Sequence, residues 1–144
     1  MLSIKSIASK ETFPVRHPVL RAGKSLESCT FDGDDLSSTI HFGLYIDDAL
    51  VGVISVFEVS NNIFIKKRQF QIRGMAVLES HQKKGCGEKL IRYVEENLRG
   101  EFIWFNAREI AVGFYKKLGY APIGMPFEIN DVGVHYVMYK NLEH

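Results

Sequence analysis

The loop from Gln82 to Gly87 (QKKGCG) is the part of this sequence whose residue types and spacing are best suited to chemistry. It joins a predicted strand at about 69–78 to a predicted helix at about 88–99. A helix N-terminus carries unpaired N–H groups and about half a positive charge. Glycine lacks a Cβ atom, so the backbone of such a loop can approach a ligand closely. The pattern favours a site for phosphate or pyrophosphate. The alternative is a glycine turn with solvated lysines.

Two familiar nucleotide-binding patterns are absent from this stretch, since neither GxxxxGK(S/T) nor GxGxxG occurs in it. Upstream, Gly74 interrupts the predicted strand, and a glycine inside a strand often marks a bulge. The unpaired N–H groups of a bulge can bind a carbonyl. The alternative is a glycine beside a bulky core neighbour. No Cys and His cluster has the spacing of a metal site, so no metal is expected.

The composition excludes several broad classes of protein. The chain has 144 residues, of which 46% are hydrophobic and 24% charged, as in an average soluble domain. Ten Phe, six Tyr and one Trp supply a core and exclude disorder as the main state. A net charge of +1 argues against nucleic-acid binding by bulk charge.

The sequence also indicates where the protein works. No window approaches the ~20 apolar residues of a membrane span, and the N-terminus lacks the pattern of a secretory signal. Two cysteines, Cys29 and Cys86, are too few for a disulfide scaffold. We therefore expect a cytoplasmic protein that binds neither nucleic acid nor a membrane. Residues 142–144 (LEH) read like the start of an affinity tag, which leaves 1–141 as a single domain.

The periodicity predicts an α/β (α+β) chain with helices packed on a mixed sheet. Strands are expected at 2–8, 39–46, 50–59, 69–78, 102–105, 121–125 and 133–140. Helices are expected at about 12–21, 88–99 and 108–118, and residues 22–37 read as a loop. The second helix has Leu90, Ile91, Val94 and Leu98 at helical spacing, and the third has Ile110, Ala111, Phe114 and Leu118 on one face. Gly119 stands where a left-handed residue would end the third helix.

Two segments resemble the signatures of the GCN5-related N-acetyltransferases (GNAT). The residues Gln82 to Gly87 match the pattern Q/R-x-x-G-x-G/A. Downstream, the segment from Asn106 to Tyr120 is similar to the family's second motif, N-x-R-x-x-A-x-x-F-Y-x-x-L-G-F/Y. The two motifs stand in the family's order, separated by a predicted helix and strand. Together they cover roughly residues 70–125.

The resemblance implies a fold, a cosubstrate and a reaction. The fold is a mostly antiparallel central sheet with flanking helices and two splayed parallel strands, here 69–78 and 102–105, that hold acetyl-CoA. The reaction transfers an acetyl group from acetyl-CoA to a primary amine of a small molecule or peptide by direct attack. The alternative is a non-catalytic acetyl-CoA-binding sensor or interaction module. The sequence does not fix the acceptor, nor whether the protein forms a homodimer.

The resemblance also assigns roles to individual residues. The backbone of Met75, Ala76 and Val77 would hold the pantetheine arm and polarise the thioester carbonyl. The rest of the expected cofactor-binding set is Gln82, Lys83, Lys84, Gly85, Cys86, Gly87, Glu88, Asn106 and Phe114. A helix N-cap is the alternative role for Asn106. Tyr115 is the expected acid for the departing CoA thiolate, and its alternative is a tyrosine at the edge of the core.

The base that accepts the amine proton is not readable from the sequence. Glu79 lies just past the central strand and is the expected catalytic partner, while His81, His41 and Glu58 are further candidates. A water chain would remove the need for any single base. The acid-rich residues 32–35 (DGDD) can attract a cationic substrate, but the alternative is a solvated loop.

Overall fold

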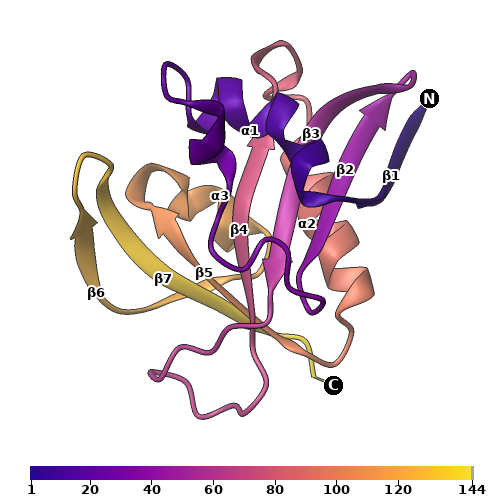
Figure 1. Cartoon of the computed structure of the whole chain (residues 1–144). Helices are drawn as coiled ribbons and strands as arrows, with labels where there is room; N and C mark the ends of the chain where they lie inside the picture. The colour runs from indigo at the N-terminus through magenta and orange to yellow at the C-terminus, as the bar shows by residue number, and fades with distance from the viewer. Residues whose placement is uncertain (144) are drawn as a thin grey trace. The chain divides into compact units, whose positions relative to one another are not determined.

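The computed structural model describes residues 1–143 and has an α/β architecture (Figure 1). The strands are β1 (Leu2–Ile7), β2 (Ile40–Ile46), β3 (Ala49–Phe57), β4 (Phe70–Val77), β5 (Phe102–Arg108), β6 (Ala121–Ile129) and β7 (Gly133–Asn141). The α-helices are α1 (Phe13–Leu20), α2 (Cys86–Asn97) and α3 (Val112–Lys117). Hydrogen-bonded strands follow the order β1-β2-β3-β4-β5-β7-β6 in one seven-stranded, mostly antiparallel sheet. The predicted fold class is confirmed.

The chain divides into two compact units. The first, called the N-terminal unit, consists of Met1–Glu58 and Ile72–Asn97. The second, called the C-terminal unit, consists of Val59–Gln71 and the chain from Leu98 onward. No helix among residues 1–143 is long and apolar enough to cross a membrane.

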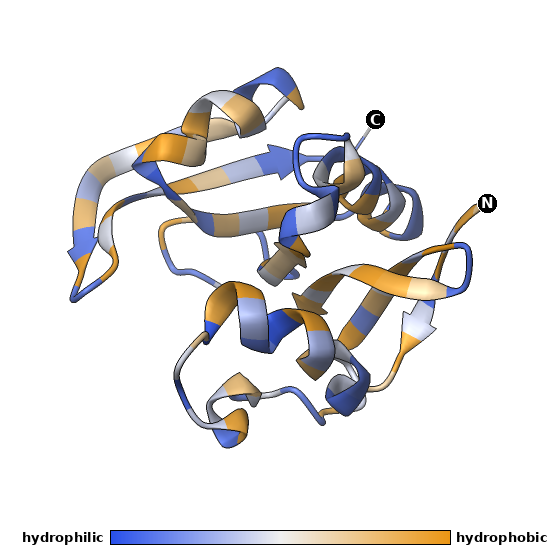
Figure 2. Ribbon diagram, turned by 90° about the horizontal axis from the view of Figure 1, so that it is seen from above, coloured by the Kyte–Doolittle hydropathy of each residue, from blue (hydrophilic) through white to orange (hydrophobic). Residues whose placement is uncertain are grey.

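In the N-terminal unit, α1 and α2 cover opposite faces of the sheet (Figure 1). On one face, Val53 of β3 packs with Val15 of α1. On the other face, a Cβ atom added to Gly52 would lie 3.2 Å from a methyl group of Leu90 in α2. Adjacent strand residues point to opposite sides of a sheet, so the two helices lie on different sides. Polar and apolar residues accordingly alternate along the helical ribbons (Figure 2).

Helix α2 has the amphipathic pattern that the sequence predicts. Leu90, Ile91 and Val94 are fully buried, and burial of such a side chain stabilises the fold by about 1.5–3 kcal/mol. The ring of Tyr93 meets Phe42 of β2 edge to face, with 5.0 Å between the ring centroids. The helix begins at Cys86, two residues before the predicted start, so the glycine loop leads directly into its first turn.

In the C-terminal unit, β5 has a hydrogen-bonded strand on each side. It pairs in antiparallel register with β7 from Phe102↔Asn141 to Arg108↔His135. It pairs in parallel with the first two residues of β4, as Phe70↔Ile103 and Gln71↔Trp104. The predicted end of this strand at residue 105 is wrong, because the backbone pairing with β7 continues through polar residues that the hydrophobic pattern does not mark. The strand predicted at 121–125 likewise extends to Ile129.

The helix predicted at 108–118 is the largest error in the predicted elements. Residues Glu109–Ala111 form a 3-10 turn, and only Val112–Lys117 are α-helical. Ile110 is 92% exposed and Phe114 is 39% exposed, so the predicted apolar face is not buried as a whole. Gly119 has φ +98°, which confirms the left-handed residue expected at the helix end.

Candidate active site

The loop before α2 has the geometry of an anion site. Gly85 has φ +84° and Lys83 has φ +62°, so the loop winds in the left-handed region before the helix starts. The first helical hydrogen bond runs from the Lys89 amide to the Gly85 carbonyl (3.1 Å). Within residues 1–143, the amides from Lys84 to Gly87 donate no hydrogen bond. Such free amides at a helix start are suited to binding phosphate oxygens.

The side chains around the loop leave these amides accessible. Lys83 and Lys84 are exposed and add positive charge. A Cβ atom added to Gly85 would meet nothing within 4 Å, so its positive φ, and not crowding, requires glycine. The Gln82 side chain donates to the Val77 carbonyl (2.8 Å), which ties the loop to the end of β4. Cys86 is buried, which makes a reactive role for its thiol unfavourable.

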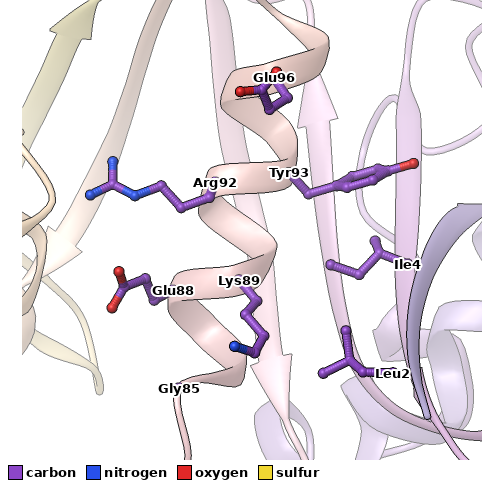
Figure 3. Close-up of a pocket in the computed structure, with 8 residues that line it drawn as sticks. All are labelled: Leu2, Ile4, Gly85, Glu88, Lys89, Arg92, Tyr93 and Glu96. Atoms are coloured by element: carbon purple, nitrogen blue, oxygen red, sulfur yellow. The ribbon is translucent and has the colours of Figure 1, made fainter.

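A groove of about 550 Å³ runs along α2 from the same loop (Figure 3). Its apolar wall is formed by Leu2 and Ile4 of β1 with Tyr93. The polar lining comes from α2 and consists of Glu88, Lys89, Arg92 and Glu96. Because the groove carries two acidic and two basic side chains, its charge does not select an anion. The free amides of the loop are therefore the feature best suited to a phosphate group.

Strand β4 contains an irregularity at Gly74, where φ is +68°. A Cβ atom there would lie only 2.7 Å from the Phe31 ring, so glycine is required both by conformation and by space. The sequence left a bulge and a bulky neighbour as alternatives, and Gly74 combines a left-handed backbone with a bulky neighbour. The predicted pantetheine-binding residues Met75, Ala76 and Val77 follow directly, and Ala76 is buried.

A buried ionic network lies on the α1 side of this strand. Arg16 of α1 has no exposed surface, and its guanidinium binds both carboxylate oxygens of Asp34 (2.7 and 3.1 Å). The same guanidinium donates to the Cys29 carbonyl (2.8 Å) and to Ser55 Oγ of β3 (2.9 Å). Sequence reasoning missed Arg16, because its position between Val15 and His17 gives no sign that it pairs with a residue 18 positions away.

The network also fixes the charge state of Asp34. Burial alone would raise the pKa of Asp34, but hydrogen bonds from Arg16 and from the Phe31 amide, together with the charge of Arg16, hold the pKa below its usual range. The acid-rich loop is therefore partly structural and not merely solvated. Asp35 accepts a hydrogen bond from Ser9 Oγ (2.7 Å), while Asp32 is exposed.

The structure excludes His41 as an accessible base. Its side chain is buried, with Nδ1 2.6 Å from Ser55 Oγ and Nε2 2.9 Å from the Asp34 carbonyl. Glu79 is exposed in the turn that follows β4, at the same end of the strand as the glycine loop. His81 lies in the same turn and is within 2.8 Å of Ser80 Oγ. Among the candidates from the sequence, Glu79 is thus the exposed carboxylate nearest in the chain to the loop.

Tyr115 lies in α3 of the C-terminal unit within an aromatic cluster. Its ring centroid is 4.5 Å from that of Phe105 and 5.1 Å from that of Phe114. Burial raises the pKa of Tyr115 to about 12, above the ordinary value near 10 assumed from the sequence. Among the described residues, its hydroxyl makes no hydrogen bond, so the phenolic proton is available for a ligand.

The N-cap alternative for Asn106 is wrong. Asn106 lies inside β5, opposite Val137 of β7, and its side chain is exposed. The residue that precedes the 3-10 turn is Arg108, not Asn106. The side-chain amide of Asn106 therefore projects from strand β5 and does not cap a helix.

The fold and the glycine loop define an acetyltransferase, and comparison with known proteins agrees. The chain belongs to the acetyltransferase (GNAT) family, whose model matches residues 5–120. It is 34% identical over 145 residues to the uncharacterized N-acetyltransferase YitI of Bacillus subtilis (strain 168). The alignment covers 99% of this chain and 97% of YitI. The protein is therefore an N-acetyltransferase of this family, which uses acetyl-CoA.

Solved structures share the fold at low sequence identity. The ribosomal-protein-S18-alanine N-acetyltransferase from Escherichia coli has a TM-score of 0.78 at 16% identity, over 100% of this chain and 96% of that one. An aminoglycoside 6'-N-acetyltransferase complexed with coenzyme A has a TM-score of 0.74 at 16% identity, over 97% of each chain. At such identities the likeness supports the architecture alone.

Proposed function

We propose that the loop amides from Lys84 to Gly87 hold the pyrophosphate of acetyl-CoA, and that the backbone of Met75–Val77 holds its pantetheine arm. The observation that carries this proposal is the run of unpaired amides at the start of the 12-residue helix α2. Lys83, Lys84 and Lys89 add the positive charge that a pyrophosphate requires. Acetyl-CoA itself supplies a thioester, whose carbonyl carbon is attacked by the acceptor amine.

The donor set fits this cosubstrate. A pyrophosphate offers several anionic oxygens, and charge-assisted hydrogen bonds from amides are about twice as strong as neutral ones. Gly85 leaves open space where a side chain would stand, so the backbone can approach the ligand closely. Within the wider predicted set, Gln82 supports the loop through its bond to Val77, and Glu88 is exposed in the first turn of α2.

Tyr115 is proposed to stabilise the CoA thiolate as it departs. Its pKa of about 12 exceeds that of an ordinary thiol, near 8.5, so full proton transfer to the thiolate would cost about 5 kcal/mol. We infer that the hydroxyl keeps its proton and donates a hydrogen bond to sulfur. The CoA thiolate then takes its proton from solvent water after it has left, and the amine proton leaves by a separate route.

Glu79 is the proposed acceptor of the amine proton, directly or through water. It is exposed and lies in the turn that joins β4 to the phosphate loop. The attacking amine must be neutral, so the reaction rate should rise with pH until the amine is deprotonated. Replacement by Gln should lower kcat/KM without weakening the binding of acetyl-CoA.

We further propose that residues 1–141 act as a single cytoplasmic N-acetyltransferase domain. Support comes from the family match over residues 5–120 and from the relative aligned over almost its entire length. The absence of a membrane-crossing helix in residues 1–143 agrees with this placement.

The cosubstrate proposal is tested by thermal unfolding with CoA, acetyl-CoA, ATP and NAD added separately. A ligand at 100 times its Kd that binds only the folded protein adds about 2.7 kcal/mol, which corresponds to several degrees for a chain of this size. We expect an upward shift with CoA and acetyl-CoA. A larger shift with ATP or NAD would overturn the proposed loop function.

A further inference from the structure

Three arginines gather around the ring of Phe31 in the N-terminal unit. The guanidinium carbon of Arg16 lies 4.0 Å from the ring centroid, that of Arg73 5.1 Å and that of Arg21 5.3 Å. All three distances are within the range of cation–π contacts. Arg73 also lies 5.3 Å from the ring centroid of Phe57. The ring of Phe31 thus contacts three positively charged side chains.

Only one of these cations is bound to a carboxylate. Arg16 is neutralised by Asp34. Arg21 donates to the carbonyls of Ser28 and Leu20 (both 3.1 Å), which are neutral groups. Across residues 1–143, Arg73 forms neither a hydrogen bond nor an ion pair, although its side chain is half-buried. Two guanidiniums therefore keep their capacity to bind an anion.

Burial and the neighbouring charges set the electrostatic surroundings of Arg73. Burial lowers the pKa of Arg73, and the charges of Arg16 and Arg21 lower it further, while Asp34 and Asp32 raise it. Three cations and two carboxylates leave the cluster with a net positive charge. An incoming anion would remove this imbalance, and guanidinium groups bind carboxylate and phosphate oxygens in a two-pronged geometry.

The cluster lies beside the predicted thioester-binding residues and away from the phosphate loop. Arg73 is adjacent to Gly74 and two residues before Met75. At about 3.3 Å per strand residue, Arg73 is roughly 7 Å from Met75 along β4 and roughly 13 Å from Val77, where the strand ends. A Cβ atom added to Gly74 would touch the ring of Phe31, so this ring lies directly against the irregular residue of β4.

We propose that Arg73 and Arg21, held on the ring of Phe31, bind an anionic group of the acceptor, so that the substrate is a small amine that also carries a carboxylate or a phosphate. This inference rests on the proposed N-acetyltransferase function and names the class of acceptor for the same site. Arg16 is a positioning residue, because Asp34 neutralises its charge while its guanidinium packs 4.0 Å from the centroid of the ring.

The test compares matched acceptors by the release of CoA thiol from acetyl-CoA. Glycine, β-alanine and L-glutamate are compared with their amides, and 2-aminoethyl phosphate is compared with ethanolamine. We expect kcat/KM to be about ten- to hundredfold higher for the anionic member of a pair, as for a charge-assisted hydrogen bond. The amino acids and the aminophosphate distinguish a carboxylate acceptor from a phosphate acceptor.

Variants then test whether the arginines around Phe31 cause the preference for an anionic acceptor. Arg73→Gln should raise the KM for the anionic acceptor and bring the ratio within a pair close to one, while Arg73→Lys should restore part of it. Lys24→Gln is the matched control, since it removes the same charge from an exposed position of the same unit. If Arg73→Gln does not fold, Arg21→Gln is measured instead, because Arg21 is also half-buried and lies 5.3 Å from the centroid of the same ring.

The outcomes separate this inference from the proposed function. Equal kcat/KM within the pairs, turnover of only the uncharged amines, or no turnover of any anionic amine overturns the anionic-acceptor inference. So does an Arg73→Gln variant whose defect lies in the KM for acetyl-CoA. The CoA-induced rise in unfolding temperature does not depend on Arg73, so its loss in the wild-type protein contradicts the proposed function instead.

Discussion

The loop at residues 82–87, which we propose binds the pyrophosphate, can be tested by comparing Gly85 with Gly100. Gly85 has φ +84° and Gly100 has φ +82°, and an added Cβ atom would meet nothing within 4 Å at either position. Replacement by Ala therefore causes no clash at either site and costs only the left-handed backbone strain, about 1–2 kcal/mol. For a chain of this length, both variants should unfold roughly 3–8 °C below the wild-type protein.

The two variants should differ in their binding of CoA. Alanine favours a negative φ, and relief of the strain at residue 85 would turn the loop amides away from the ligand. Loss of one charge-assisted hydrogen bond costs about 1.5–3 kcal/mol, which is roughly a 10- to 100-fold increase in Kd. Gly100 follows the end of α2, outside the loop, and its replacement should leave the Kd unchanged.

Calorimetric titration of CoA into both variants at equal temperature measures this difference. Differential scanning of the same samples gives the stability cost and shows that both proteins are folded. The reasoning is refuted if Gly85→Ala binds CoA like the wild-type protein despite its lower unfolding temperature. It is equally refuted if Gly100→Ala weakens CoA binding by the same factor.

Three further results are expected. Tyr115→Phe should lower kcat roughly 10- to 100-fold by removing a hydrogen bond to the thiolate, and the Kd for CoA should be unchanged. Burial raises the pKa of Tyr115 to about 12. Stopped assays of the wild-type protein should therefore show no loss of rate from ionisation of Tyr115 below about pH 11. Asp34→Asn should destabilise the fold by about 3–5 kcal/mol in a urea titration, since it leaves the charge of Arg16 buried and unpaired. The lowered pKa of Asp34 stabilises the folded protein at pH values above the ordinary aspartate pKa of about 3.9, and this contribution is lost as the pH falls through the folded-state pKa. Acid unfolding followed by circular dichroism should therefore begin at a higher pH in variants that weaken the Arg16 contact. Gly74→Ala should unfold at a lower temperature than Gly85→Ala, because it adds a 2.7 Å contact with Phe31 to the backbone strain; equal unfolding temperatures would contradict this.

Local patterns in the sequence were sufficient for most of the fold. Helix α2 follows from apolar residues at a spacing that only a helix brings to one side, and Leu90, Ile91 and Val94 are indeed fully buried. The glycine loop could be located because its signal, a strand followed by two glycines and an amphipathic helix, is contained in about twenty consecutive residues. The free amides themselves follow from helix geometry.

Features that depend on distant partners could not be predicted. Arg16 is buried because Asp34 and Ser55, 18 and 39 positions away, meet its guanidinium, and no local pattern marks such a meeting. His41 was a reasonable base by residue type and was excluded only by the same network. The end of β5 was misplaced because its partner β7 lies about thirty residues downstream and imposes the pairing through the backbone.

The attachment of the 22–37 segment through a few hydrogen bonds, chiefly from the buried Arg16, has a consequence for how this enzyme can be altered. Arg16 reaches the segment at the Cys29 carbonyl and the Asp34 carboxylate, and Phe31 is held between them by the hydrogen bond from its amide to Asp34 (2.9 Å). The Ser28 carbonyl, which accepts from Arg21, and the Asp35 carboxylate, which accepts from Ser9, anchor the segment further. Arg21 and Arg73 lie outside the segment and Phe31 is one of its anchors. Loop grafts that keep these contacts and vary the other residues of the segment should therefore keep both the fold and the proposed preference for an anionic acceptor.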